Sequence, residues 1–149
     1  MKRSQTKSMA IAVASNKIGY VFMMDGEVKD WGLSSTAAKS PEAAVAKVKY
    51  WLDFYQPNLI VTEKLSPHTR KSGRTICNVN IIADMADKYD EHHIQVERVQ
   101  TYPSKYDEID DLAVRFSVLE SWKPERRKPW QSEAKNTIIF EALALLVAE

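Results

Sequence analysis

Hydrophobic residues gather in three short runs near the beginning of the chain, at 9–14, 18–24 and 28–33. The runs are rich in residues that favour β-strands, and the links between them are short. Asp25 and Gly26 separate the second and third runs, and this pair suits a type I′ turn, which needs positive φ at both central residues. The pattern predicts three sequentially antiparallel strands.

The spacing of apolar residues changes to three and four after Ser40 and Pro41, a pair typical of a helix start. Pro57 ends this predicted helix. The next run, 58–63, is β-branched and stops at Glu63, as expected of a buried parallel strand that follows a crossover helix. The first part of the chain is therefore predicted to be three strands, a helix and a strand.

The remaining chain continues to alternate between helical and extended patterns. The prediction is a helix at 67–89, a strand at 94–99, a helix at 105–122, a linker at 123–131, and a helix capped by Ser132 that runs to Ala148. The acidic first turn at 107–111 suits the dipole of its helix.

Composition indicates one globular domain. With 149 residues, of which 44% are hydrophobic and 28% charged, the chain is long enough to bury a core without disulfides. We expect a flexible lead at 1–8 and a single domain at 9–149. A lone cysteine, Cys77, allows no internal disulfide; it is expected to be a small core residue, and the predicted location is cytoplasmic. The run 9–14 is too short to span a membrane, so no membrane partner is expected.

The balance of 21 Lys plus Arg against 20 Asp plus Glu gives a net charge of +1, so any case for nucleic acid rests on local patches. Two patches qualify as candidate phosphate contacts. Their residues are Lys64, His68, Arg70, Lys71 and Arg74 in the first, and Arg126 and Arg127, with Lys123 and Lys128, in the second. Trp122 and Trp130 flank the second patch, and the preferred interpretation is that both indoles are buried anchors of the loop.

The predicted element order is that of the RNase H-like fold, with a five-stranded mixed sheet in the order 3-2-1-4-5. Within that fold the chain resembles the RuvC family of Holliday-junction resolvases. The likeness rests on Gly19-Tyr20 after a short first strand, on Glu63 at the end of the fourth, on the segment 71–74, and on Glu141 within the last helix, which is similar to the family's Asp-Ala-Leu-Ala pattern.

The resemblance implies a Mg²⁺- or Mn²⁺-dependent endonuclease that acts on branched or structured DNA, in preference to RNA, as a homodimer with paired sites. In such nucleases two metal ions, held by about four carboxylates, activate a water and stabilise the leaving oxygen. Glu63 and Glu141 are the expected catalytic residues and metal ligands, and Asn16 is a further candidate ligand through its neutral oxygen.

The sequence departs from the family pattern at two positions. The family's first-strand aspartate has no counterpart, since the corresponding stretch at 14–17 reads Ala-Ser-Asn-Lys, and the first acid of the last helix is replaced by Ile138. Two carboxylates are few ligands for a hard cation, which binds mostly through the charge of carboxylate groups. Whether the chain is an enzyme is therefore left open.

Each candidate also has a plainer explanation. Glu63 is equally well a solvated strand end, Glu141 a surface residue beside an apolar stripe, and the patch after Glu63 a solvated helix start. The alternative function is a catalytically inactive RNase H-like module, without a cofactor, that binds nucleic acid or a protein partner. A component of a protein assembly is a third possibility.

Overall fold

The computed structural model describes residues 6–67, 69, 71–89, 92–97, 102, 104–126, 128, 130–131 and 134–148. Its strands are β1 (Lys7–Val13), β2 (Ile18–Met24), β3 (Glu27–Ser34), β4 (Leu59–Glu63) and β5 (His92–Val96). Its helices are α1 (Pro41–Tyr55), α2 (Gly73–Asp87), α3 (Lys105–Arg115) and α4 (Thr137–Ala148), with 3₁₀ turns η1 (Thr36–Lys39) and η2 (Ser117–Trp122).

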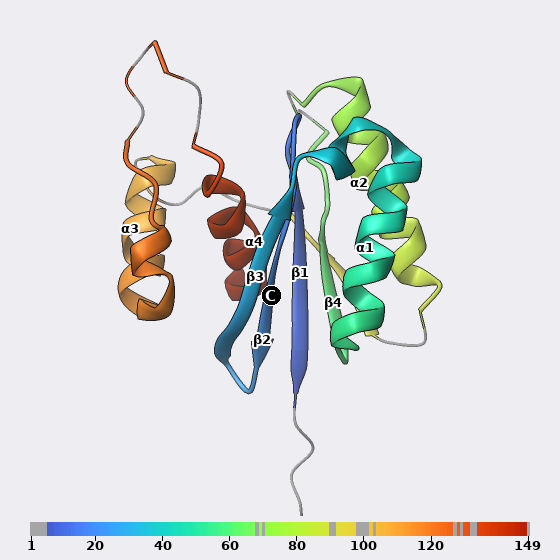
Figure 1. Ribbon diagram of the computed structural model, residues 1–149, viewed down its shortest axis with the longest axis horizontal. Coiled ribbons are helices and arrows are strands. Elements are labelled where there is room, and N and C mark those ends of the chain that lie inside the picture. Colours follow the sequence, from blue (N-terminus) through green and yellow to red (C-terminus); the bar gives the residue numbers. More distant parts are fainter. Residues whose placement is uncertain are drawn as a thin grey trace, which may run out of the picture.

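The strands form one mixed sheet in the order β3-β2-β1-β4-β5, as predicted. β1, β2 and β3 pair as antiparallel neighbours, while β4 lies parallel to both β1 and β5. The turn between β2 and β3 has the expected geometry, with φ of 53° at Asp25 and 84° at Gly26. The parallel strands β1 and β4 both end at the top of Figure 1.

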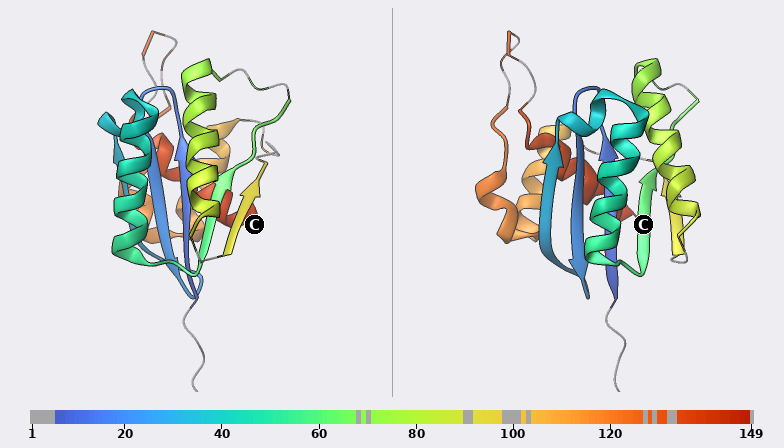
Figure 2. Two further views of the ribbon diagram at one scale, coloured as in Figure 1. Left: turned by 90° about the vertical axis from the view of Figure 1, so that its right-hand side faces the viewer. Right: turned by 45° about the vertical axis from the view of Figure 1, so that its right-hand side comes forward.

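Helices cover both faces of the sheet. α1 and α2 lie together on one face, and α4 lies against the other with α3 outside it (Figures 1 and 2). The face under α4 buries Ala10, Ala12, Val21 and Val61, whereas the alternate side chains, such as Ile11 and Ile60, pack under α1 and α2. Because successive side chains of a strand point to opposite faces of the sheet, the apolar residues are divided between two cores.

Local capping explains where several helices begin. Ser40, Ser72 and Ser104 each accept a hydrogen bond from a backbone N–H three residues later, at 3.1, 3.2 and 3.3 Å. The predicted cap at Ser40 is confirmed. Ser72 caps α2, which begins at Gly73 rather than at the predicted residue 67.

Other boundaries also differ from the predictions. β1 begins at Lys7, two residues before the apolar run, and β5 begins at His92 instead of residue 94. The single helix predicted at 105–122 is divided into α3 and η2, because Phe116 leaves the helical region with φ of −123° and ψ of 75°. α4 begins at Thr137, and the predicted cap, Ser132, lies outside the described residues.

The prediction that Cys77 is a core residue is wrong, because its side chain is exposed. The buried face of α2 is formed by its neighbours Thr75, Asn78, Val79 and Ile82, which turns Cys77 toward solvent. Within the described part of the chain, every helix is too short or too polar to cross a membrane.

Candidate functional site

Glu63 is the last residue of β4 and lies beside the end of β1. The parallel register pairs Thr62 with Ile11, and Glu63 points to the same face of the sheet as Val61, the face that α4 covers. Its side chain is only 11% exposed, and its Oε2 atom is fully buried without a hydrogen-bond partner. A buried carboxylate oxygen of this kind needs a positive charge nearby.

Lys71 supplies that charge. Its Nζ lies 3.7 Å from Oε2 of Glu63 and donates a hydrogen bond of 3.1 Å to the carbonyl oxygen of Val13, the last residue of β1. The ammonium group therefore sits at the ends of two neighbouring parallel strands and holds them together by one hydrogen bond and one ion pair.

Two further cations belong to the same edge. Arg74, in the first turn of α2, donates to the carbonyl oxygen of Ser15 at 3.3 Å. Lys17 is only 5% exposed, and its Nζ donates to Oδ1 of Asn16 at 3.4 Å. We call Lys17, Glu63, Lys71 and Arg74 the strand-edge cluster; its three cations surround the turn between β1 and β2, and it contains one carboxylate.

These contacts account for the basic residues at the start of α2. Cations near a helix N-terminus are unfavourable because they face the positive end of the helix dipole. Here Lys71 and Arg74 reach across to carbonyl oxygens of Val13 and Ser15. Charge-assisted hydrogen bonds to these carbonyls offset the dipole cost and dock the start of α2 against the end of β1.

A hollow of about 220 Å³ opens beside the cluster. It is lined by Glu63, Lys64, Leu65, Ser66, Thr69, Lys71 and Glu97. Glu97 directly follows β5, which is parallel to β4, so its position at this edge follows from the topology. The sequence pattern does not single out Glu97 or Lys17. Glu97 could have been found as an acidic residue directly after a strand, and Lys17 as a lysine in a short turn between two buried strands.

The stretch at 14–17, where the first-strand acid is expected, carries no carboxylate, and Ser15 and Asn16 there are exposed. Ala12, near the end of β1 on the face to which Glu63 points, is 2% exposed. Ile138 is fully buried in the first turn of α4, close to Gly19 of β2. Glu141 lies one helical turn further along α4 and is half-buried.

The residues present do not fit a site for two divalent ions. Among the described residues, no group of three or more His, Cys, Asp or Glu side chains is placed to hold a metal ion. Two predicted ligand oxygens each lie near an ammonium group instead: Oε2 of Glu63 faces Lys71, and Oδ1 of Asn16 accepts from Lys17. Hard divalent cations require several oxygen ligands with net negative charge, and this edge is cationic.

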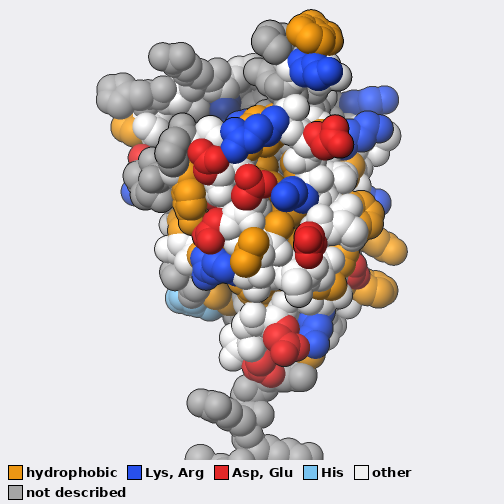
Figure 3. Space-filling model, turned by 90° about the vertical axis from the view of Figure 1, so that its left-hand side faces the viewer, with side chains coloured by type: hydrophobic (Ala, Val, Ile, Leu, Met, Phe, Trp, Pro, Cys, Tyr) orange, Lys and Arg blue, Asp and Glu red, His pale blue; other side chains and the backbone are white. Residues whose placement is uncertain are grey.

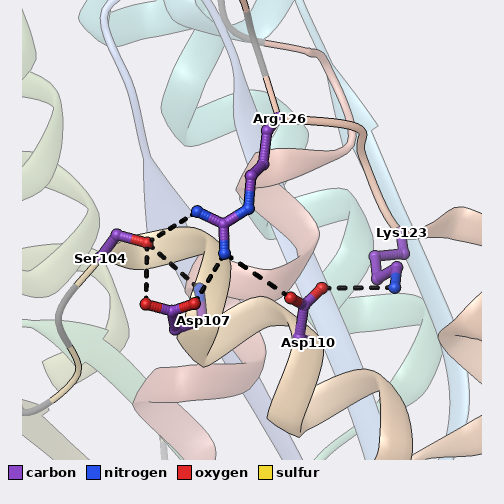
Figure 4. Close-up of polar contacts among 5 residues, drawn as sticks. All are labelled: Ser104, Asp107, Asp110, Lys123 and Arg126. Carbon is purple, nitrogen blue, oxygen red and sulfur yellow. Dashed lines mark hydrogen bonds and ion pairs between the residues drawn. The ribbon is translucent and has the colours of Figure 1, made fainter.

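The second basic patch is arranged differently. Arg126 donates to Oδ1 of Asp107 at 2.6 Å and lies 3.8 Å from Asp110, and Lys123 pairs with Asp110 at 3.3 Å (Figure 4). The hydrogen bond from Arg126 lowers the pKa of Asp107 below its usual value. Acidic and basic side chains alternate over this side of the molecule in Figure 3. Lys123 and Arg126 thus attach the segment after η2 to α3 by ion pairs. Arg127 lies outside the described residues.

The interpretation of both flanking indoles as buried anchors is wrong. Trp130 is 78% exposed, with Nζ of Lys128 5.6 Å from its ring centroid, and Trp122 is 42% exposed. Trp122 does make an edge-on contact with Trp31, at 5.8 Å between centroids, so it retains part of the anchoring role. Of the first patch, His68 and Arg70 also lie outside the described residues, and Lys64 is exposed beside the hollow.

A chain of polar contacts joins Thr62, His93 and Asp87. Nε2 of His93 lies 2.7 Å from Oγ1 of Thr62, and its Nδ1 contacts Asp87. This order of groups is that of a nucleophile, a base and an orienting acid. Thr62 is 1% exposed, however, so its hydroxyl cannot meet a substrate, and the chain serves to join β4, β5 and α2.

No protein-family model matches the sequence, and a search of curated proteins gives no significant match. Solved structures do match over nearly the whole chain. RuvC of Thermus thermophilus is 10% identical, with a TM-score of 0.60, over 96% of this chain and 92% of that one. A Fowlpox virus resolvase in complex with Holliday junction DNA is 10% identical, with a TM-score of 0.58, over 97% of this chain and all of that one. T. thermophilus RuvC with a Holliday junction substrate also matches, at 11% identity and a TM-score of 0.57, over 96% and 92% of the two chains.

The sheet order and these matches show that the chain has an RNase H-like fold. The fold is of the type found in RuvC and the poxvirus resolvase, as the sequence resemblance predicts.

Proposed function

We propose that the protein binds branched DNA at the edge of the sheet where β1 and β4 end. The observation that carries this proposal is the pair of accessible cations Lys71 and Arg74 beside the turn between β1 and β2, with Glu63 as the one carboxylate of the cluster. Lys17 is buried, so it adds positive charge to this edge without contacting a ligand. Phosphate groups bind to such clusters through charge and hydrogen bonding.

The choice of DNA rests on the structural neighbours. Two of them are resolvases in complex with Holliday junctions, and they match at least 96% of this chain. A four-way junction brings several phosphate backbones close together, so a compact cationic edge has more phosphates within reach than it has on a linear duplex. We therefore propose a preference for branched over linear DNA.

A second candidate function is a divalent-metal-dependent endonuclease that acts as a homodimer. The observation that favours it is the buried Oε2 atom of Glu63, an acidic oxygen without a hydrogen-bond partner at a strand end. Glu63, Glu141 and Asn16 are the ligands that the sequence resemblance implies for such a nuclease. Binding without cleavage is the better-supported proposal because Lys71 and Lys17 lie against two of these oxygens.

Fluorescence anisotropy with a labelled four-way junction and a duplex of equal length tests the first proposal. We expect tighter binding of the junction, and affinity that falls steeply with salt as counterions are released. Replacing Lys71 or Arg74 by Met should weaken binding and reduce the salt slope by about 1 for each phosphate that the variant no longer neutralises.

Lys88→Met is the matched control, because Lys88 is exposed at the opposite end of α2, about 22 Å away at 1.5 Å per residue. Equal binding of junction and duplex, or equal effects of Lys71→Met and Lys88→Met, would contradict the proposal. Mg²⁺-dependent cleavage of the junction on a gel, abolished by Glu63→Gln, would establish the second candidate instead.

A further inference from the structure

The ammonium group of Lys71 lies between the ends of the parallel strands β1 and β4. It bridges the carbonyl oxygen of Val13 and Oε2 of Glu63, at 3.1 and 3.7 Å. Both atoms are hard oxygen donors of the kind that bind Mg²⁺ or Mn²⁺. A divalent ion and an ammonium group compete for the same two oxygens.

Lys71 is held firmly in this place. It lies immediately before Ser72, the residue that caps α2, and its backbone N–H donates to Oγ1 of Thr69 at 3.3 Å. Its side chain is 30% exposed, whereas that of Glu63 is 11% exposed. The ion pair is thus partly shielded from water, which strengthens it relative to a pair on the open surface.

One donor of the ammonium group is still available to a ligand. A lysine carries three N–H donors, of which Val13 accepts one and the charge of Glu63 attracts a second. The third is accessible through the exposed part of the side chain, at the hollow that Lys71 and Glu63 line together. A phosphate oxygen is the complementary ligand for such a donor.

We infer that Lys71 is the built-in cation of this edge, so that the site binds a phosphodiester without a divalent metal ion. The inference rests on the proposed binding of DNA and adds that this binding requires no metal cofactor. Glu63 then acts as a positioning residue, which keeps the ammonium group between β1 and β4. The same role falls to Asn16 for Lys17, whose ammonium group is buried and donates to Oδ1 of Asn16.

Titration of Mn²⁺ by calorimetry tests this inference without DNA. We expect weak or no Mn²⁺ uptake by the wild type and by Lys71→Arg, which keeps the charge. Lys71→Met frees Oε2 of Glu63 and the carbonyl oxygen of Val13, so Mn²⁺ affinity should rise about tenfold or more. Adding Glu63→Gln to Lys71→Met should abolish that gain.

Wild-type protein that binds Mn²⁺ as tightly as Lys71→Met, and loses this binding in Glu63→Gln, would overturn the inference. If Lys71→Met does not fold, the Mn²⁺ affinities of the wild type and of Glu63→Gln are compared directly. Equally weak affinities support the inference, and tighter Mn²⁺ binding by the wild type overturns it. Junction binding in EDTA and in Mg²⁺ provides the second readout, and we expect equal affinities. A protein that binds no junction would contradict the proposed function, while the Mn²⁺ titration would still test the role of Lys71.

Discussion

Gly19 determines how closely α4 approaches the sheet. A Cβ atom at this position would lie 2.8 Å from Cγ2 of Ile138, which is fully buried in the first turn of the helix. Such a contact is too short to be accommodated without movement of the helix or of the Ile138 side chain. The glycine therefore sets the distance between α4, which carries Glu141, and the end of β1, which pairs with β4.

Gly19→Ala should destabilise the protein by about 1–3 kcal/mol through overpacking. Thermal unfolding followed by circular dichroism measures the effect. Gly73→Ala is the control, because a Cβ at Gly73 meets nothing within 4 Å, and it should be neutral or stabilise by about 0.4–1 kcal/mol. Equal melting temperatures for Gly19→Ala and the wild type would contradict this account of the α4 contact.

At the scale of elements, ion pairs attach the segment after η2 to α3. Arg126 contacts Asp107 and Asp110 in the first two turns of α3, and Lys123 contacts Asp110. The acidic residues were expected to compensate the helix dipole, and their position allows both roles. Because these contacts join segments about 15 residues apart, the pattern of charges along the sequence does not reveal them.

Arg126→Ala should raise the pKa of Asp107 toward its ordinary value of 3.8, since the hydrogen bond from Arg126 is the largest cause of the depression. A carboxyl group with a lowered folded-state pKa contributes stability that is present above its unfolded pKa and is lost as the pH falls through the folded value. Carbon-13 NMR titration of the side-chain carboxyl measures the change. An unaltered titration of Asp107 in Arg126→Ala would show that the ion pair does not persist in solution.

For the whole molecule, the strand order could be predicted because the element order, with the Asp25-Gly26 turn and two strand-helix-strand patterns, matches that of the RNase H-like fold. Helix starts were less predictable: α2 was predicted to begin at residue 67 but begins at Gly73, where Ser72 caps it and where Lys71 and Arg74 contact the end of β1. The strand-edge cluster could be predicted in part. Glu63 was a candidate because it ends a buried strand, and Lys71 and Arg74 because they belong to a local basic patch. Their contacts with each other and with the turn at 14–17 depend on side-chain geometry across the sheet.

The junction affinities of the wild type and of Glu63→Gln, measured by anisotropy in EDTA and in Mg²⁺ at equal ionic strength, test the central claim most directly. If Lys71 is the cation of the site and Glu63 positions it, Mg²⁺ should bring no gain in affinity for the wild type, and Glu63→Gln should weaken binding equally in both buffers. If Glu63 instead holds a divalent ion, the wild type should bind or cleave the junction better in Mg²⁺ than in EDTA, and Glu63→Gln should abolish that gain. The second result would contradict the account.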